Sequence, residues 1–244
     1  MKTLSEKSEF NSELEQIEER YQKRKENQSQ RLYSPLDPYV LMVNQERERA
    51  IHRWMNATSI GQNRNQATLL EIGCGAGGNL LRFLQWGFQA ENLCGNDLLP
   101  DRIDDARELL PENIQLIAGD AFTTEFPEKE YDVVCLFTVF SSILDNDFQE
   151  QLANHVWSLV KPGGGVLWCD FIYNNPKNKD VQGVPVRRVK ELFPKAKMSY
   201  ERVHLAPPIG RRVSRIHPFL YSTLNSLPFL RSHILCWLEK ESEK

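Results

Sequence analysis

The 244-residue sequence lacks long apolar runs, and no stretch approaches the roughly 18–20 apolar residues that a membrane-spanning helix needs. It also lacks an excess of positive charge, because 30 Lys and Arg residues stand against 33 Asp and Glu, which gives a net charge of −3. Proteins that bind nucleic acid through many phosphate contacts are usually basic, so this balance disfavours such binding. The segment MKTLSEKSEF is charged and polar where a signal peptide has its apolar core. We therefore expect a soluble, cytoplasmic protein.

Paired cysteines are also absent. The sequence has five cysteines, an odd number, and they lie far apart and form no Cys-x-x-Cys pair. Neither a disulfide framework nor a zinc site is therefore indicated. Asp145 and Asp147 could be considered as metal ligands, but a solvated Asp-Asn-Asp turn is the better interpretation, and no metal is expected. Four cysteines lie in or beside apolar runs and are expected to be buried, reduced thiols: Cys94, Cys135, Cys169 and Cys236.

The first 66 residues are predicted to form a helical extension or lid. Asp37-Pro38 supplies an N-cap and a proline at the first helical position, which predicts a helix to about Ala57, and residues 61–66 form a polar linker. An earlier, highly charged segment predicts an amphipathic helix that docks on a partner, closes over the active site or frays. Its apolar stripe has helical spacing and consists of Phe10, Leu14, Ile17 and Tyr21.

From residue 67 onward, short apolar runs alternate with helical patterns. This alternation predicts one α/β domain over residues 67–244, with a parallel sheet covered by helices on both faces and an insertion at about 207–230. The expected strands are 68–72, 92–96, 114–118, 131–137, 165–171, 198–206 and 232–239, and the expected helices are 78–86, 101–110, 148–160 and 186–193.

The most informative segment is the glycine-rich turn after the first predicted strand, LLEIGCGAGGN. Glycines allow a sharp turn and a close approach of a ligand to the backbone. Gly73, Gly75 and Gly78 match the dinucleotide pattern G-x-G-x-x-G, and Asp97 follows Gly77 by twenty residues. An acidic residue there suits the ribose hydroxyls of NAD or of another adenosine cofactor. The glycines alone leave both cofactors open.

The residues beside the glycines favour an adenosine cofactor other than NAD. Glu71-x-Gly73-x-Gly75-x-Gly77 resembles the cofactor motif of class I methyltransferases, which use S-adenosylmethionine. Further features of that family occur in the expected order over residues 67–171: Asp97 after the second strand, Gly119-Asp120-Ala121 after the third, Phe137-Thr138-Val139-Phe140 after the fourth, and Lys161-Pro162-Gly163-Gly164 before the fifth.

The resemblance implies a Rossmann-like, doubly wound seven-stranded sheet whose last strand is antiparallel. It also implies that Glu71 and the Gly73 and Gly75 backbone hold the methionine end of the cofactor. Asp97 would accept hydrogen bonds from both ribose hydroxyls and Asp120 from the adenine amino group. The implied cofactor-binding set is Tyr33, Glu71, Gly73, Cys74, Gly75, Gly77, Asp97, Asp120, Ala121 and Phe137.

The acceptor side is less determined. Methyl transfer from a sulfonium needs alignment and exclusion of water more than acid–base groups. His204, His217 and Asp170 are weak catalytic candidates, and for each of them a structural role is the better interpretation. The segment after the fourth strand lacks the Asp/Asn-Pro-Pro-aromatic run with which nucleic-acid amino-methyltransferases grip a flipped base. We therefore expect a small-molecule or glycan acceptor, methylated on oxygen or nitrogen, such as a specialised metabolite or surface-glycan precursor.

Two alternatives remain for the whole protein and three for its insertion. The protein could be a non-catalytic cofactor-binding subunit or an NAD-linked oxidoreductase, although the residues after 171 do not provide the second half-sheet that such an enzyme needs. The insertion at 207–230 carries arginines near aromatic side chains. It could be a substrate lid, a packed helix with a solvated face, or a basic helix in peripheral contact with a membrane.

Overall fold

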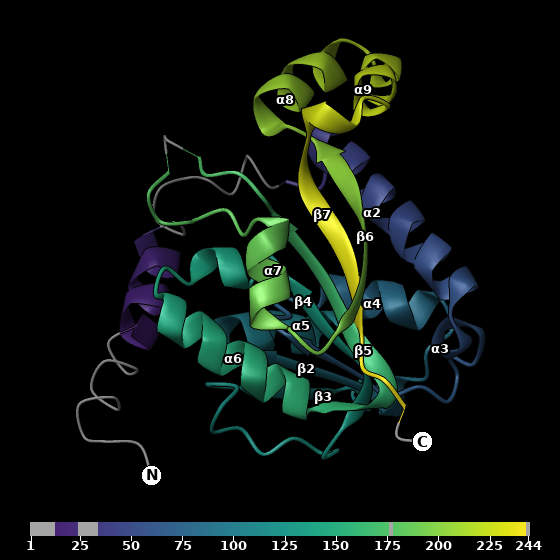
Figure 1. Cartoon of the computed structure of the whole chain (residues 1–244), viewed down its shortest axis with the longest axis vertical. Helices are drawn as coiled ribbons and strands as arrows, with labels where there is room; N and C mark the ends of the chain where they lie inside the picture. The colour runs from purple at the N-terminus through teal and green to yellow at the C-terminus, as the bar shows by residue number, and fades with distance from the viewer. Residues whose placement is uncertain (1–12, 24–33, 176–177, 243–244) are drawn as a thin grey trace.

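The computed structural model describes residues 13–23, 34–175 and 178–242. Seven strands in this part of the chain form one sheet in the order β3-β2-β1-β4-β5-β7-β6 (Figure 1). They are β1 (Leu69–Ile72), β2 (Leu93–Asp97), β3 (Gln115–Ala118), β4 (Tyr131–Phe137), β5 (Val160–Phe171), β6 (Lys197–Leu205) and β7 (Arg231–Glu239). Strands β1 to β5 pair in parallel, and β7 lies antiparallel between β5 and β6. The predicted Rossmann-like sheet is confirmed.

Helices cover both faces of the sheet. Adjacent residues of a strand point to opposite faces, and all four residues of β1 are buried, so each face of β1 is covered. On β1, Leu70 packs in the core that contains Leu152 of α6. Its neighbour Leu69 packs with Ile51 of α2 and Phe83 of α4 on the other face. The helices are α2 (Pro38–Ala57), α3 (Ser59–Gln62), α4 (Gly78–Gln85), α5 (Pro100–Leu109), α6 (Asn146–Ser158), α7 (Val186–Leu192), α8 (Pro207–Ile216) and α9 (Pro218–Asn225). A further helix spans residues 13–23.

One strand boundary differs from the expectation in an informative way. Strand β5 begins at Val160, five residues early, because the β4–β5 register shifts between Tyr131 and Val133 and so accommodates Pro162 and its glycines within the strand. The insertion at 207–230 folds as α8, α9 and a short 3-10 helix. The α2 helix starts at Pro38 with Asp37 as its N-cap, as predicted.

The remaining composition-based expectations concern cysteines, metals and membranes. All five cysteines are free and buried, which confirms the interpretation of reduced core thiols. Asp145 is the N-cap of α6, where its carboxylate accepts from the Phe148 amide at 2.7 Å. Within residues 13–23, 34–175 and 178–242, no group of three or more His, Cys, Asp or Glu side chains could hold a metal ion. No helix in the same ranges is both long and apolar enough to cross a bilayer.

Candidate active site

The turn between β1 and α4 needs glycine for two reasons. Gly73, Gly75 and Gly77 have φ values of 73°, 55° and 78°, which side-chain-bearing residues rarely adopt. A Cβ on Gly73 would lie 2.7 Å from Val139 Cγ2, and one on Gly77 would lie 2.5 Å from Leu110 Cδ1. Gly73 therefore lets the backbone approach the loop after β4, while Gly77 lets the start of α4 pack beside the end of α5.

Asp97 ends β2 and fastens this turn. Its Oδ2 accepts from the Gly75 amide at 2.8 Å, and its Oδ1 accepts from the Leu99 amide at 3.0 Å. A carboxylate has about four acceptor positions, so two protein donors leave capacity for a ligand. Asp97 can therefore hold the glycine turn and bind hydroxyl groups at the same time.

Glu71 is a buried carboxyl group in the middle of the sheet. Its Oε1 accepts from Asn79 Nδ2 at 2.6 Å, whereas the buried Oε2 has no hydrogen-bond partner. Burial raises the pKa of Glu71 to about 8. A buried acceptor without a donor costs stability, so this oxygen is prepared for a donor that a ligand brings.

Arg47 extends the same network from α2. Its Nη2 donates to Asn79 Oδ1 at 3.1 Å, and its guanidinium carbon lies 5.7 Å from the centroid of the Phe137 ring. Its positive charge opposes the protonation of Glu71. Arg47 and Asn79 thus connect the glycine turn with the end of β4.

The loop after β3 is held from α6. Asp120 Oδ1 accepts from the Phe122 amide at 3.1 Å, which turns the chain after the strand. His155 Nε2 donates to the Ala121 carbonyl at 2.9 Å, and its ring stacks on Phe122 with centroids 5.2 Å apart. This histidine fixes the backbone of the loop.

These strand ends surround a cleft whose empty space, open solvent at its mouth included, is about 790 Å³. The cleft brings together five of the predicted residues, namely Gly73, Asp97, Asp120, Ala121 and Phe137. Four others are not part of its lining, namely Glu71, Cys74, Gly75 and Gly77. Tyr33 lies outside the described residues.

The helix at residues 13–23 contributes one wall of this cleft. Leu14, Ile17 and Tyr21 line it, and the Arg102 guanidinium carbon lies 4.7 Å from the centroid of the Tyr21 ring. These are the described members of the predicted apolar stripe. The sequence left open whether this helix docks on a partner, closes over the active site or frays. In the structure its apolar stripe lies against the cleft.

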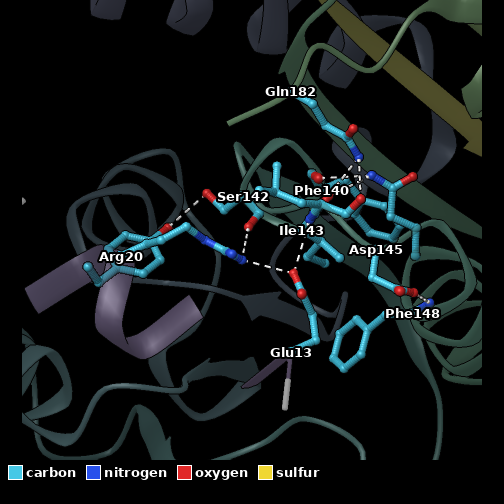
Figure 2. Close-up of polar contacts among 11 residues, drawn as sticks. Glu13, Arg20, Phe140, Ser142, Ile143, Asp145, Phe148 and Gln182 are labelled. Carbon is cyan, nitrogen blue, oxygen red and sulfur yellow. Dashed lines mark hydrogen bonds and ion pairs between the residues drawn. The ribbon is translucent and has the colours of Figure 1, made fainter. Parts of the chain in front are cut away.

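A buried polar clasp holds the helix in place (Figure 2). Arg20 Nη2 donates to Glu13 Oε1 at 2.8 Å and to the Ser142 carbonyl at 3.1 Å. The same Glu13 oxygen accepts from the Leu144 amide at 3.1 Å. Both charged side chains are only about 10% exposed. We call Glu13, Arg20 and the backbone of Ser142 and Leu144 the clasp.

The loop that the clasp contacts is itself held by two glutamines. Gln182 Nε2 donates to the Ile143 carbonyl at 2.9 Å (Figure 2). Gln149 Nε2 donates to the same carbonyl and to that of Phe140, at 3.0 and 3.2 Å. The clasp therefore attaches the N-terminal helix to an anchored loop.

Comparison with known proteins relates the part of the chain that carries these strand ends to methyltransferases. Residues 69–164, which span β1 to β5, match the family model for a methyltransferase domain. The chain therefore contains a methyltransferase domain. Among curated proteins, none matches its sequence.

Solved structures share the methyltransferase's fold at low sequence identity. An S-adenosylmethionine-dependent methyltransferase from Methanosarcina mazei is 15% identical with a TM-score of 0.53, covering 76% of this chain and 98% of its own. One from Archaeoglobus fulgidus is 15% identical with a TM-score of 0.57, covering 79% and 92%. The plantazolicin methyltransferase BpumL, solved with S-adenosylhomocysteine, is 16% identical with a TM-score of 0.57, covering 96% and 97%.

The methyltransferase's own residues fit this cofactor. An ammonium group beside Glu71 would favour its charged form, so that the unpaired buried Oε2 could accept from that group, and the spare capacity of Asp97 suits sugar hydroxyls. Gly73 keeps the backbone beside the cleft free of a side chain. These acceptors are thus appropriate for an amino acid joined to a nucleoside.

The weak catalytic candidates of the methyltransferase lie in different places. Asp170 is buried at the end of β5, where it accepts from the Ser141 amide at 3.0 Å and burial raises its pKa to about 7. His204 is buried at the end of β6, has φ 63°, and neither ring nitrogen has a partner. His217 is exposed, and its Nδ1 accepts from the Phe219 amide as the N-cap of α9.

The His204 ring lies beside a second buried imidazole. Its centroid is 4.7 Å from that of His233, and burial lowers the pKa of both rings, that of His233 to about 4. The positive charge of Arg47 lowers both pKa values further. Both imidazoles are therefore neutral near pH 7, and each keeps one nitrogen lone pair.

Sequence reasoning missed several groups that shape the site. Asn79 stands directly after the glycine turn and could have been found from its position at the start of a helix. Arg47 is one of several charged residues on α2, and no spacing distinguishes it. The role of His155 depends on the contact between α6 and the loop after β3, which no local pattern shows.

Proposed function

We propose that this methyltransferase transfers the methyl group of S-adenosylmethionine to an oxygen or nitrogen of a small-molecule acceptor. The observation that carries the proposal is the cleft at the ends of β1, β2 and β4, walled by the N-terminal helix. When bound, the cofactor supplies an electrophilic methyl group that the acceptor takes up by in-line displacement. The protein's task is then to align the acceptor and exclude water.

In this proposal, the cofactor extends from the glycine turn to the loop after β3. Glu71 and the backbone at Gly73 and Gly75 bind the methionine end, while Asp97 accepts from the ribose hydroxyls. Asp120 and Ala121 bind the adenine, and His155 positions their loop through the Ala121 carbonyl. Phe137 lies at the methyl-transfer end. Cys74 and Gly77 shape the turn, and Tyr33 remains a predicted contact to the cofactor's carboxylate.

Three features support a small acceptor. Leu14, Ile17 and Tyr21 of the N-terminal helix line the cleft, and a wall of this kind suits a small acceptor better than a polymer. The net charge of −3 and the apolar loop at 137–140 offer neither a phosphate-binding surface nor the base-gripping motif of nucleic-acid methyltransferases. The plantazolicin methyltransferase BpumL, whose structure aligns with 96% of this chain at 16% sequence identity, is named for a specialised metabolite. Specialised metabolites and surface-glycan precursors are the acceptor classes that we favour.

We further propose a division of labour along the chain. Residues 1–66 serve as a helical lid, and residues 67–244 form the catalytic domain with the insertion at 207–230. The helix at 13–23 closes over the cofactor, and α2 carries Arg47 to the glycine turn.

His204 is the acceptor-side residue that we favour. Its neutral ring has a lone pair with no partner, so it can accept a hydrogen bond from an acceptor hydroxyl or amine. Asp170 has a donor from Ser141 already and serves mainly to hold the loop after β4. His217 is committed to capping α9.

The test combines cofactor titration with transfer of a radiolabelled methyl group to a panel of hydroxyl- and amine-bearing small molecules. Asp97→Asn should weaken S-adenosylhomocysteine binding by at least about tenfold, because one charge-assisted hydrogen bond is worth about 1.5–3 kcal/mol. Asp104→Asn, on the exposed face of α5, is the matched control and should bind normally. His204→Gln should keep cofactor affinity and lower the methylation rate.

Three results would each contradict a part of the proposal. Labelling of RNA or DNA in preference to every small molecule would overturn the acceptor class. Normal cofactor binding by Asp97→Asn would overturn the assignment of the ribose site. Equal methylation rates for wild type and His204→Gln would remove His204 from the acceptor side.

A further inference from the structure

The helices α8 and α9 form the part of the molecule that stands farthest beyond the carboxyl ends of the strands (Figure 1). Their inner side is packed, because Tyr221 and Leu205 are buried against Tyr39 and Met42 of α2. Tyr221 also donates to the buried Glu46 at 2.9 Å. The tip is therefore a firmly attached structure and not a loose loop.

The outer side of the tip exposes large apolar side chains in two short segments. Every residue from 215 to 220 is exposed, including Ile216 at 73% and Phe219 at 67%. Every residue from 226 to 229 is exposed as well, including Phe229 at 70%. These segments lie at the two ends of α9. We call residues 215–220 and 226–229 the apolar tip.

The charge around the apolar tip differs from that of the rest of the chain. Residues 207–230 contain three arginines and no Asp or Glu, although the whole protein has a net charge of −3. Arg211 and Arg215 face Asp37 at 3.9 and 3.3 Å. Arg212 is exposed and forms no ion pair with any described residue. The tip is cationic on an otherwise acidic protein.

A projecting surface that combines exposed Phe, Ile and Leu with arginine has the composition of an interfacial membrane helix. Arginine near an anionic bilayer contributes attraction, and the apolar side chains gain from entering the interface. A protein partner that grips a projection would need a complementary groove, whereas a bilayer needs only a convex apolar end with positive charge.

We propose that the apolar tip docks on an anionic lipid surface, with Ile216, Phe219 and Phe229 entering the interface and Arg212 facing the headgroups. Figure 1 shows the tip beyond the carboxyl ends of the strands, and Gly73, Asp97 and Phe137 of the cleft lie at those strand ends, so docking brings that edge toward the lipid surface. This surface is independent of the acceptor proposed above.

The experiment is sedimentation of the full chain with vesicles of phosphatidylcholine alone and of phosphatidylcholine mixed with phosphatidylglycerol. Wild type should pellet with the mixed vesicles, less so at high salt, and little with the neutral ones. The double variant Phe219→Ser/Phe229→Ser should reduce the partition coefficient by at least about tenfold. Arg212→Gln should reduce it several-fold.

The matched control is Leu109→Ser/Tyr200→Ser, which removes two exposed apolar side chains elsewhere, at 47% and 50% exposure. Titration with S-adenosylhomocysteine confirms that each variant is folded, and vesicle binding needs neither cofactor nor acceptor. The proposal is overturned if wild type does not pellet, if the control loses as much binding as the tip variant, or if neutral vesicles bind equally. It is also overturned if wild type is a dimer that the tip variant dissociates, because a second copy would then cover the tip.

Discussion

Replacing Glu13 by glutamine tests how the N-terminal helix is held on the cleft. The glutamine keeps the size of the side chain and an acceptor oxygen for the Leu144 amide. It removes the negative charge that faces Arg20 at 2.8 Å, in a place where both side chains are about 10% exposed. The guanidinium would then be buried with only the Ser142 carbonyl and a neutral amide as acceptors.

The cost follows from the burial of the clasp. A hydrogen bond to a charged group is worth about 1.5–3 kcal/mol, and removing one partner of a fully buried pair costs about 3–5 kcal/mol. The clasp is slightly exposed, so we expect a loss of about 2–3 kcal/mol. Because the helix can detach without unfolding the sheet, this loss falls on local docking and corresponds to roughly a 30- to 150-fold increase in opening.

Hydrogen exchange of residues 13–23, followed by mass spectrometry, measures that opening. Exchange should accelerate by the same factor in Glu13→Gln, while residues 69–72 of the central strand stay protected. Affinity for S-adenosylhomocysteine should fall as well, since Leu14, Ile17 and Tyr21 line the cleft. Glu15→Gln makes the same chemical change on the exposed side of the same helix and serves as the control.

Equal exchange rates in the Glu13 and Glu15 variants would refute the reasoning. The apolar stripe alone would then hold the helix, and the clasp would be incidental. Faster exchange with unchanged cofactor affinity would separate docking of the helix from cofactor binding.

Two further predictions concern the cofactor site. Burial raises the pKa of Glu71 from its ordinary 4.5 to about 8, so its contribution to the free energy of unfolding falls as the pH rises across this interval. The melting temperature of Glu71→Gln relative to wild type, measured without cofactor, should therefore rise from pH 4.5 to 8, and a constant difference would contradict the buried-acid assignment. His155→Phe keeps the stacking on Phe122 but loses the bond to the Ala121 carbonyl, so calorimetry should show about two- to tenfold weaker S-adenosylhomocysteine binding. His52→Phe, on the exposed side of α2, should bind like wild type.

The sheet was predictable because its signals are local. Strands β1, β3 and β4 are short, mostly apolar runs, each followed by a residue with positive φ, and the glycines at 73, 75 and 77 have backbone conformations that other residues rarely adopt. The position of Asp97 at a strand end follows from the same local pattern. The start of β5 was not predictable, since the register shift after Tyr131 arises only when two distant strands pair.

The groups around the cleft that escaped prediction act over long sequence distances. The clasp joins residues 20 and 142 through a backbone carbonyl, which leaves no mark in the side-chain pattern at position 142. The neutrality of His204 results from its burial and from the nearby Arg47, which is far away in the sequence. Local periodicity shows which face of an element is buried but not which element will cover it.

The clasp also links affinity to turnover. In the proposed function the spent cofactor shares the cleft with Leu14, Ile17 and Tyr21, so a helix that helps to retain S-adenosylmethionine would also retain its product. A tighter clasp would strengthen binding and slow product release, until release of the product rather than methyl transfer limits the steady state. Rapid-mixing experiments on such an enzyme would show a fast first turnover followed by slower ones, and loosening the clasp would shrink that burst.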